Sequence, residues 1–168
     1  MRKRHFGGGA LHAVAIAVLT SAALGGAAGA AASQPMEVVI HESTTFAPNH
    51  QPPVGAFTAE GLPGCSSGSF SDQPVSFSPN GTRLILDRSY VCAEGGTLTA
   101  RVGLHLGTID SSGLQTVEGS WRIVAGTAAL TDAAGSGSVS GLNSGCAPVG
   151  VVFGECAFGT GTTRAWVH

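Results

Sequence analysis

Glycine punctuates the stretch Glu118–Gly141, and this pattern constrains the fold more than any other part of the chain. A strand-like run ends at Trp121–Val124, and Gly126 follows it as a hinge. A short apolar segment through Leu130 then leads into a run of small residues, Gly135–Gly141. Glycine permits the backbone angles and close strand approaches that a strongly coiled sheet needs. The stretch therefore predicts consecutive strands of a coiled β-sheet.

A first hairpin is predicted around the dipeptide Asn80-Gly81, which lies between two alternating apolar runs. Asn-Gly is the strongest short signal for a tight hairpin turn. Pairing across it sets Phe77 opposite Leu84 and Val75 opposite Leu86, so that one face is apolar. The same register sets Cys92 opposite Ser69.

A second hairpin joins two longer runs. Thr97–Ile109 alternates strictly between apolar and polar residues, and Leu114–Ala125 returns after a four-residue loop. Taking Ile109 opposite Leu114 sets Val102 against Trp121, and apolar residues then face apolar ones throughout. Further strands are expected at Glu37–Phe46, Val54–Glu60, Gly137–Leu142 and Ala157–Val167. About eight strands at regular spacing predict a sandwich or a barrel.

The N-terminus has the form of a secretory signal peptide. Basic residues at Arg2–Arg4 precede an apolar run, Leu11–Leu24, and small residues follow it. The alternative, a membrane anchor, requires roughly 20 predominantly apolar residues. We expect cleavage after residue 32, a flexible leader over 33–36, and a single domain over 37–168, secreted without membrane insertion.

The composition after cleavage excludes two classes of partner. Of eight basic residues three precede the cleavage site, which leaves five arginines and no lysine against ten carboxylates, a net charge of about −5. Nucleic acids and anionic membrane surfaces attract basic clusters, and none is present. We expect neither as a partner, and we expect a monomer or a homodimer.

Four cysteines, Cys65, Cys92, Cys146 and Cys156, follow the predicted cleavage site. An even number in an exported chain favours two disulfides over a metal site or a thiol nucleophile, and sequence alone permits three pairings. We favour Cys65–Cys92, because the first hairpin brings them to one end, and Cys146–Cys156, which would staple a chain reversal. No metal site and no cofactor is expected.

Several motifs resemble the allene oxide cyclase and dirigent barrels, including small secreted bacterial relatives. They are Phe57–Gly61, Gly119–Ile123, Gly126-Thr127 and Gly135–Gly141. Ala128 departs from the family pattern, which has a second glycine at this turn. The resemblance implies an all-β fold, an antiparallel β-barrel of about eight strands whose interior can hold a small apolar molecule. The family's acidic and phenolic pocket residues match no motif here, so no catalytic residue is assigned.

Two groups of residues are candidates for chemistry. His105 faces Glu118 in the predicted register, and a carboxylate that orients an imidazole can perform acid–base catalysis. The alternative interpretation is a solvated charged pair on the outside of the hairpin. Arg88, Tyr90 and Trp121 are candidates for contact with a ligand in the barrel, and the alternative is that the aromatic residues only pack.

The sequence favours a binding module over an enzyme. Eight strands form a barrel that can hold one small ligand. The second hypothesis is an enzyme of the cyclase or isomerase type, and the third is a surface interaction protein with a filled barrel. An enzyme needs charged or phenolic groups inside the barrel, whereas a filled barrel contains apolar side chains there.

Overall fold

The computed structural model describes residues 34–46, 52–152 and 154–168. The predicted signal peptide, residues 1–32, lies outside these ranges. Eight strands follow one another: β1 (Met36–Thr45), β2 (Val54–Glu60), β3 (Ser67–Phe77), β4 (Arg83–Cys92), β5 (Thr97–Leu106), β6 (Gln115–Gly126), β7 (Gly135–Ser144) and β8 (Phe158–Val167). A short 3-10 helix, η1 (Ala128–Leu130), lies between β6 and β7.

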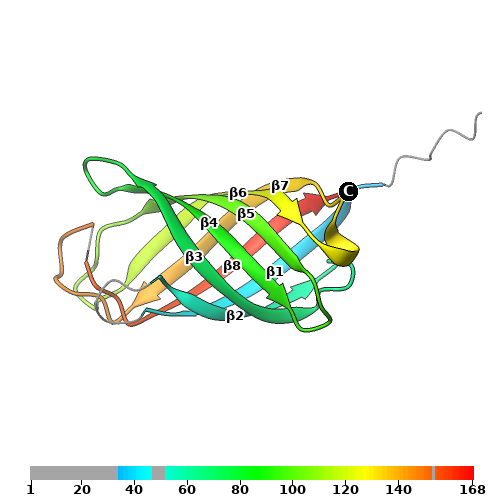
Figure 1. Ribbon diagram of the computed structural model, residues 1–168. Coiled ribbons are helices and arrows are strands. Elements are labelled where there is room, and N and C mark those ends of the chain that lie inside the picture. The colour runs from blue at the N-terminus through cyan, green and yellow to red at the C-terminus, as the bar shows by residue number, and fades with distance from the viewer. Residues whose placement is uncertain (1–33, 47–51, 153) are drawn as a thin grey trace, which may run out of the picture. The chain divides into compact units, whose positions relative to one another are not determined.

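The strands form a closed antiparallel barrel, which confirms the predicted fold class (Figure 1). Each strand pairs with its neighbours in sequence, and β8 closes the barrel by pairing with β1 over ten residue pairs. Side chains alternate between the interior and the outer wall, so that Val38 and Ile40 of β1 are fully buried whereas His41 is exposed. The apolar half of each alternating pattern thus forms the core.

The two ends of the barrel differ. Turns β2–β3 and β4–β5 and helix η1 lie at one end (Figure 1). We call it the closed end, because Leu62, Cys65 and Leu130 of these connections are buried and belong to the core. We call the opposite end the open end; there the β3–β4 and β5–β6 turns and the β7–β8 connection lie.

Both predicted disulfides are present, one at each end. Cys65–Cys92 links the β2–β3 turn to the end of β4 across 27 positions of sequence. Cys146–Cys156 staples the β7–β8 connection across 10 positions. Among the described residues no cysteine is free.

The predicted register is confirmed for β5–β6 from Ala100 to Leu106 and is partly wrong for β3–β4. Val102 faces Trp121, as predicted, although β5 ends at Leu106 and not at Ile109. Before Ala100 the pairing shifts by one residue, so that Thr99 faces Ala125 instead of Val124. Phe77 faces Leu84, but a bulge at Val75 shifts the pairing, so that Pro74 and not Val75 faces Leu86. The shift continues along the hairpin, and Cys92 faces Gly68 instead of Ser69.

The bulge has a physical cause. Proline cannot donate a hydrogen bond to a sheet ladder, and within strands it is confined to edges, first positions and bulges. Pro74 occupies an interior position of β3, next to the point where the pairing slips by one residue. Because side chains alternate with a period of two, the slip exchanges the inner and outer faces of β3.

The hinge at Gly126 is confirmed as a close backbone approach. A Cβ atom at this position would lie 1.9 Å from the carbonyl oxygen of Leu130, so that only glycine fits. Ala128, two residues further on, adopts a left-handed conformation with a φ of 55°.

Candidate functional site

A cavity of about 1220 Å³ occupies the open half of the barrel. Small-molecule sites are concave, mostly apolar and carry a few polar groups, and this volume is ample for one small organic molecule. The apolar wall is formed from strands β3 to β7 and includes Phe77, Leu84, Leu86, Leu104, Leu106, Val117 and Val139. On the β8 side the lining includes Gly159 and Gly161, against which the side chains of Asn143 and Glu42 lie.

The floor of the cavity is an ion pair. Arg88 of β4 and Asp72 of β3 face each other across the two strands and are both nearly inaccessible to solvent. The Nε of Arg88 donates to Asp72 Oδ1 at 2.6 Å, and its Nη2 donates to Asp72 Oδ2 at 2.7 Å. This is the bidentate geometry in which a guanidinium binds a carboxylate most strongly.

A second carboxylate joins the pair from across the barrel. Arg88 Nη1 donates to Glu42 Oε2, and the hydroxyl of Tyr90 donates to Glu42 Oε1. Trp121 Nε1 in turn donates to the Tyr90 oxygen at 3.3 Å. The five side chains come from β1, β3, β4 and β6, and we call them the floor network: Glu42, Asp72, Arg88, Tyr90 and Trp121.

Aromatic rings support the floor network. The Tyr90 ring packs edge-on against Phe57, with centroids 5.1 Å apart. The guanidinium of Arg88 lies over the ring of Phe70 at 4.5 Å from its centroid, a cation–π contact. Arg88 is thus fixed by carboxylates at its edges and by a ring on one face.

Burial and charge set the ionisation of the network. Burial alone would lower the pKa of Arg88, but the hydrogen bond with Asp72 and the charge of Glu42 outweigh it and hold that pKa well above its ordinary value. Burial and the Glu42 charge raise the pKa of Tyr90 well above its ordinary value. The guanidinium therefore stays charged and the phenol stays neutral across the physiological range.

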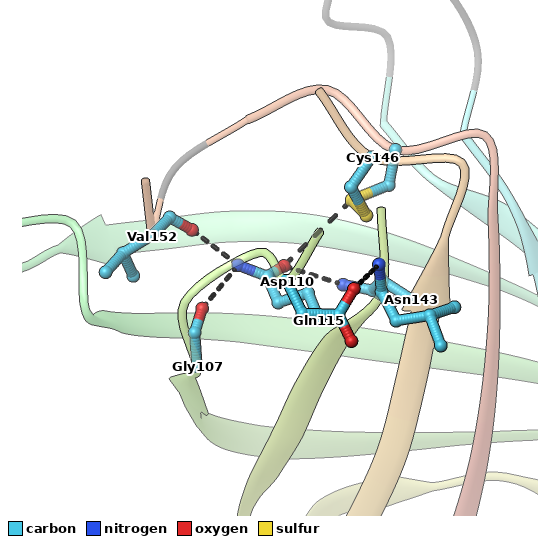
Figure 2. Close-up of a disulfide and its surroundings, with 8 residues drawn as sticks. Gly107, Asp110, Gln115, Asn143, Cys146 and Val152 are labelled. Carbon is cyan, nitrogen blue, oxygen red and sulfur yellow. Dashed lines mark hydrogen bonds between the residues drawn. A yellow bond between two sulfur atoms is a disulfide. The ribbon is translucent and has the colours of Figure 1, made fainter. Parts of the chain in front are cut away.

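At the open end, Gln115 of β6 links two connections that border the cavity. The side-chain amide of Gln115 donates to the carbonyl oxygens of Gly107, at 2.8 Å, and Val152, and Asn143 donates to the Gln115 Oε1 at 3.2 Å (Figure 2). The Cys146–Cys156 disulfide lies directly beside this carboxamide (Figure 2). Gln115 therefore fastens the β7–β8 connection to the β5–β6 turn.

The bulge in β3 positions the floor. With an unbroken register Asp72 would point outward, because Val75 and Phe77 would share the inner face with Leu86. The slip at Val75 turns Asp72 inward, directly opposite Arg88. Bulges commonly re-aim a side chain next to a functional site.

The structure brings the three predicted ligand contacts together but gives them different positions. Arg88 lines the cavity directly. Tyr90 and Trp121 are buried, at 0% and 1% exposure, and lie behind Arg88 as members of the floor network. A ligand in the cavity would therefore contact Arg88. Tyr90, to which Trp121 donates, would hold Arg88 in position through their shared partner Glu42.

His105 and Glu118 lie elsewhere. They face each other in the β5–β6 register, as predicted, but both side chains are exposed on the outer wall, apart from the cavity. The imidazole Nε2 accepts a hydrogen bond from Arg83 Nε at 3.0 Å. This position agrees with the solvated-pair interpretation.

Glu42 and Asp72 were not predicted as site residues. Glu42 carried a readable signal, since it alternates in phase with Val38, Ile40 and Thr44 and so belongs to the inner face of β1. Asp72 carried no such signal, because the register extrapolated from the Asn80-Gly81 turn places it on the outer face. Only Pro74, in the interior of β3, indicated the bulge that turns Asp72 inward.

Comparison with known proteins adds no assignment: no family model, no curated protein and no solved structure matches the chain. Within the described ranges, histidine, cysteine and carboxylate side chains form no group of three that could hold a metal ion. Nor does this part of the chain contain a helix long and apolar enough to cross a membrane.

Proposed function

We propose that the protein is a secreted barrel that binds one small, largely apolar molecule in its open half. The cavity of about 1220 Å³ above the floor network is the observation that carries this proposal. A barrel packed only for stability would fill this volume with side chains, since protein interiors contain few voids larger than a water molecule. Secretion is supported by the signal-like N-terminus and by the two disulfides.

A relationship to the allene oxide cyclase and dirigent barrels is part of this proposal. Two features support it: the sequence motifs of Glu118–Gly141, and a closed eight-stranded barrel of the kind that the resemblance implies. We infer no catalytic residue from it.

An enzyme of the cyclase or isomerase type is the second candidate. One observation favours it: Glu42 and Tyr90, a carboxylate and a phenol, point into the barrel and share a hydrogen bond. Neither is among the residues that line the cavity, however, whereas Arg88 and Asp72 are. General acid–base catalysis requires direct reach to the substrate, or reach through one water molecule, so the binding module is the better supported function.

Native mass spectrometry of the exported protein tests the proposal. We expect a discrete excess mass of a few hundred daltons over the denatured chain, because the cavity is of drug-molecule size. The variant Val139→Phe should carry the excess mass at lower occupancy, since Val139 lines the cavity and the larger ring takes up part of it.

A matched control separates filling of the cavity from a general effect of phenylalanine. Val124 also lies on a strand but is 45% exposed on the outer wall, so Val124→Phe should retain the excess mass. Equal occupancy in Val139→Phe and Val124→Phe would place the ligand outside the cavity and contradict the proposal.

A further inference from the structure

The cavity floor carries more negative than positive charge. Two buried carboxylates, Glu42 and Asp72, surround one buried guanidinium, Arg88, and these are the buried charged side chains of the described residues. Tyr90 supplies a hydrogen bond but no charge. Among the described lining residues, Glu155 adds a further carboxylate, and Arg88 is the sole basic side chain.

Arg88 is a poor site for an anion. Three of its five N–H groups already donate to carboxylate oxygens, and its face lies over Phe70. A ligand carboxylate at the two remaining N–H groups would lie beside Asp72 and Glu42 and would be repelled by both. Displacing either of them instead would leave a buried carboxylate without its partner, which is strongly unfavourable.

Asp72 is better placed to receive a ligand. It lines the cavity, and its two oxygens each accept one hydrogen bond from Arg88. A carboxylate offers about four lone-pair sites, so acceptor capacity remains on the cavity side. A cation there would also restore the charge balance of a floor whose walls are apolar and whose interactions are weakly screened.

We infer that the ligand of this cavity is an apolar molecule with a basic amine, whose ammonium group sits at the floor against Asp72. This inference rests on the proposed binding function and specifies the chemical class of its ligand. The hydrocarbon part fills the wall between Leu86, Leu104 and Val117, and the ammonium group donates to the carboxylate.

Three probes that differ only in the head group test this assignment: dodecylamine, dodecanol and dodecanoate. Their binding to the full exported chain, freed of any co-purified ligand, is measured by titration calorimetry at pH 7, below the concentrations at which the probes self-associate. We expect dodecylamine to bind at least about tenfold more tightly than dodecanoate, with dodecanol between them.

A matched pair of variants locates the effect. Asp72→Asn removes the inward carboxylate and should abolish the preference for the amine. Asp87→Asn removes a carboxylate that pairs with Arg101 in the same bidentate way, at 2.8 and 2.9 Å, but on the outer wall, and should keep the preference. If Asp72→Asn does not fold, the order of the three head groups on the wild-type protein decides.

The outcomes separate the inference from the function on which it rests. Equal binding of the three probes, or tighter binding of dodecanoate, would overturn the amine assignment and leave the binding function standing. If none of the three probes binds, both the assignment and the proposed function fail.

Discussion

At the scale of single residues, the ion pair of Asp72 and Arg88 dominates the interior. The carboxylate and the guanidinium are 5% and 6% exposed, so both are largely shielded from water. Removing one member of a buried ion pair leaves the other desolvated and unpaired, which costs about 3–5 kcal/mol. Arg88 also keeps Glu42 as a partner, which limits the loss.

We therefore predict that Asp72→Asn lowers the free energy of unfolding by about 3 kcal/mol, measured by urea denaturation. Asp87→Asn breaks a pair with the same bidentate geometry on the exposed outer wall and should leave the urea midpoint close to that of the wild type. Equal losses in the two variants would show that burial does not set the strength of this interaction.

Tyr90 is the only tyrosine of the chain, so its ionisation can be followed without interference. Its pKa in the folded protein is raised by burial and by Glu42, well above the ordinary value. The folded protein therefore keeps the phenol proton at a pH where the unfolded chain loses it. The contribution of Tyr90 to stability is complete below about pH 10 and falls as the pH rises further.

We predict that tyrosinate absorbance appears only as the protein unfolds in alkali, and that the free energy of unfolding declines above about pH 10. Tyr90→Phe has a lower starting stability, because it loses the hydrogen bonds to Glu42 and from Trp121, but a shallower alkaline decline. A tyrosinate signal from protein that remains folded near pH 10 would contradict the assignment of a buried, neutral phenol.

At the scale of elements, the sequence predicted strands well and their faces less well. Alternation located β2 with its exact bounds and set Val102 against Trp121, because apolar periodicity and burial have the same cause. The Asn80-Gly81 turn fixed the register of β3–β4 only near the turn. A bulge depends on pairing across strands, and a register extrapolated from one turn cannot contain it.

The candidate site was therefore predicted in part. Arg88 and Tyr90 were found because they share a face of β4 with the apolar residues, and β4 keeps a regular alternation. Asp72 was not predicted, because the bulge reverses the face of β3 on which it lies. Glu42 was not predicted either, because its place on the inner face of β1 does not show that it reaches Arg88 across the barrel. The closure of the sheet, which brings β1 and β4 to opposite sides of one floor, is a property of the whole fold.

The β6–η1 connection contains a strained position. Ala128 is the sole non-glycine residue of the described ranges with a positive φ, a conformation that costs an L-residue about 1–2 kcal/mol. We predict that Ala128→Gly raises the free energy of unfolding by about 1 kcal/mol, measured by urea denaturation. Ala129→Gly should act in the opposite direction, because its φ is not positive and glycine then only adds freedom to the unfolded chain.

The two disulfides should contribute differently to stability and to ligand binding. Cys65–Cys92 spans 27 positions and Cys146–Cys156 spans 10, which correspond to about 3.5 and about 2.7 kcal/mol in the chain-entropy model. Cys156 also lines the cavity, whereas Cys65 and Cys92 lie at the closed end. Replacing both cysteines of a pair by alanine therefore separates stability from binding.

We predict that Cys65→Ala with Cys92→Ala lowers the melting temperature more but leaves the affinity for the dodecyl probes nearly unchanged. Cys146→Ala with Cys156→Ala should lower the melting temperature less and weaken probe binding. The reason is that the β7–β8 connection, which Gln115 links to the β5–β6 turn, loses its disulfide. The reverse pattern would contradict the placement of the binding site at the open end.

At the scale of the whole molecule, the barrel has one packed half and one open half. The gradient is visible along β5, which runs from the closed to the open end: Leu98, Ala100 and Val102 are 0% exposed, Leu104 is 9% exposed and Leu106 is half-buried. The closed half thus supplies most of the core, and the open half supplies the site.

Hydrogen exchange should report this division. Local openings require less free energy where fewer apolar contacts are lost, so the amides of Leu104 and Leu106 should exchange faster than those of Leu98 and Val102. A bound probe adds contacts only in the open half and should slow exchange at Leu104 and Leu106 while leaving that at Leu98 unchanged, as measured by residue-resolved exchange with and without dodecylamine. The variant Val139→Phe should weaken this response while keeping the protection of the closed half. Uniform slowing along β5 would instead mean that the probe stabilises the barrel as one unit, and the functional division between the halves would not hold.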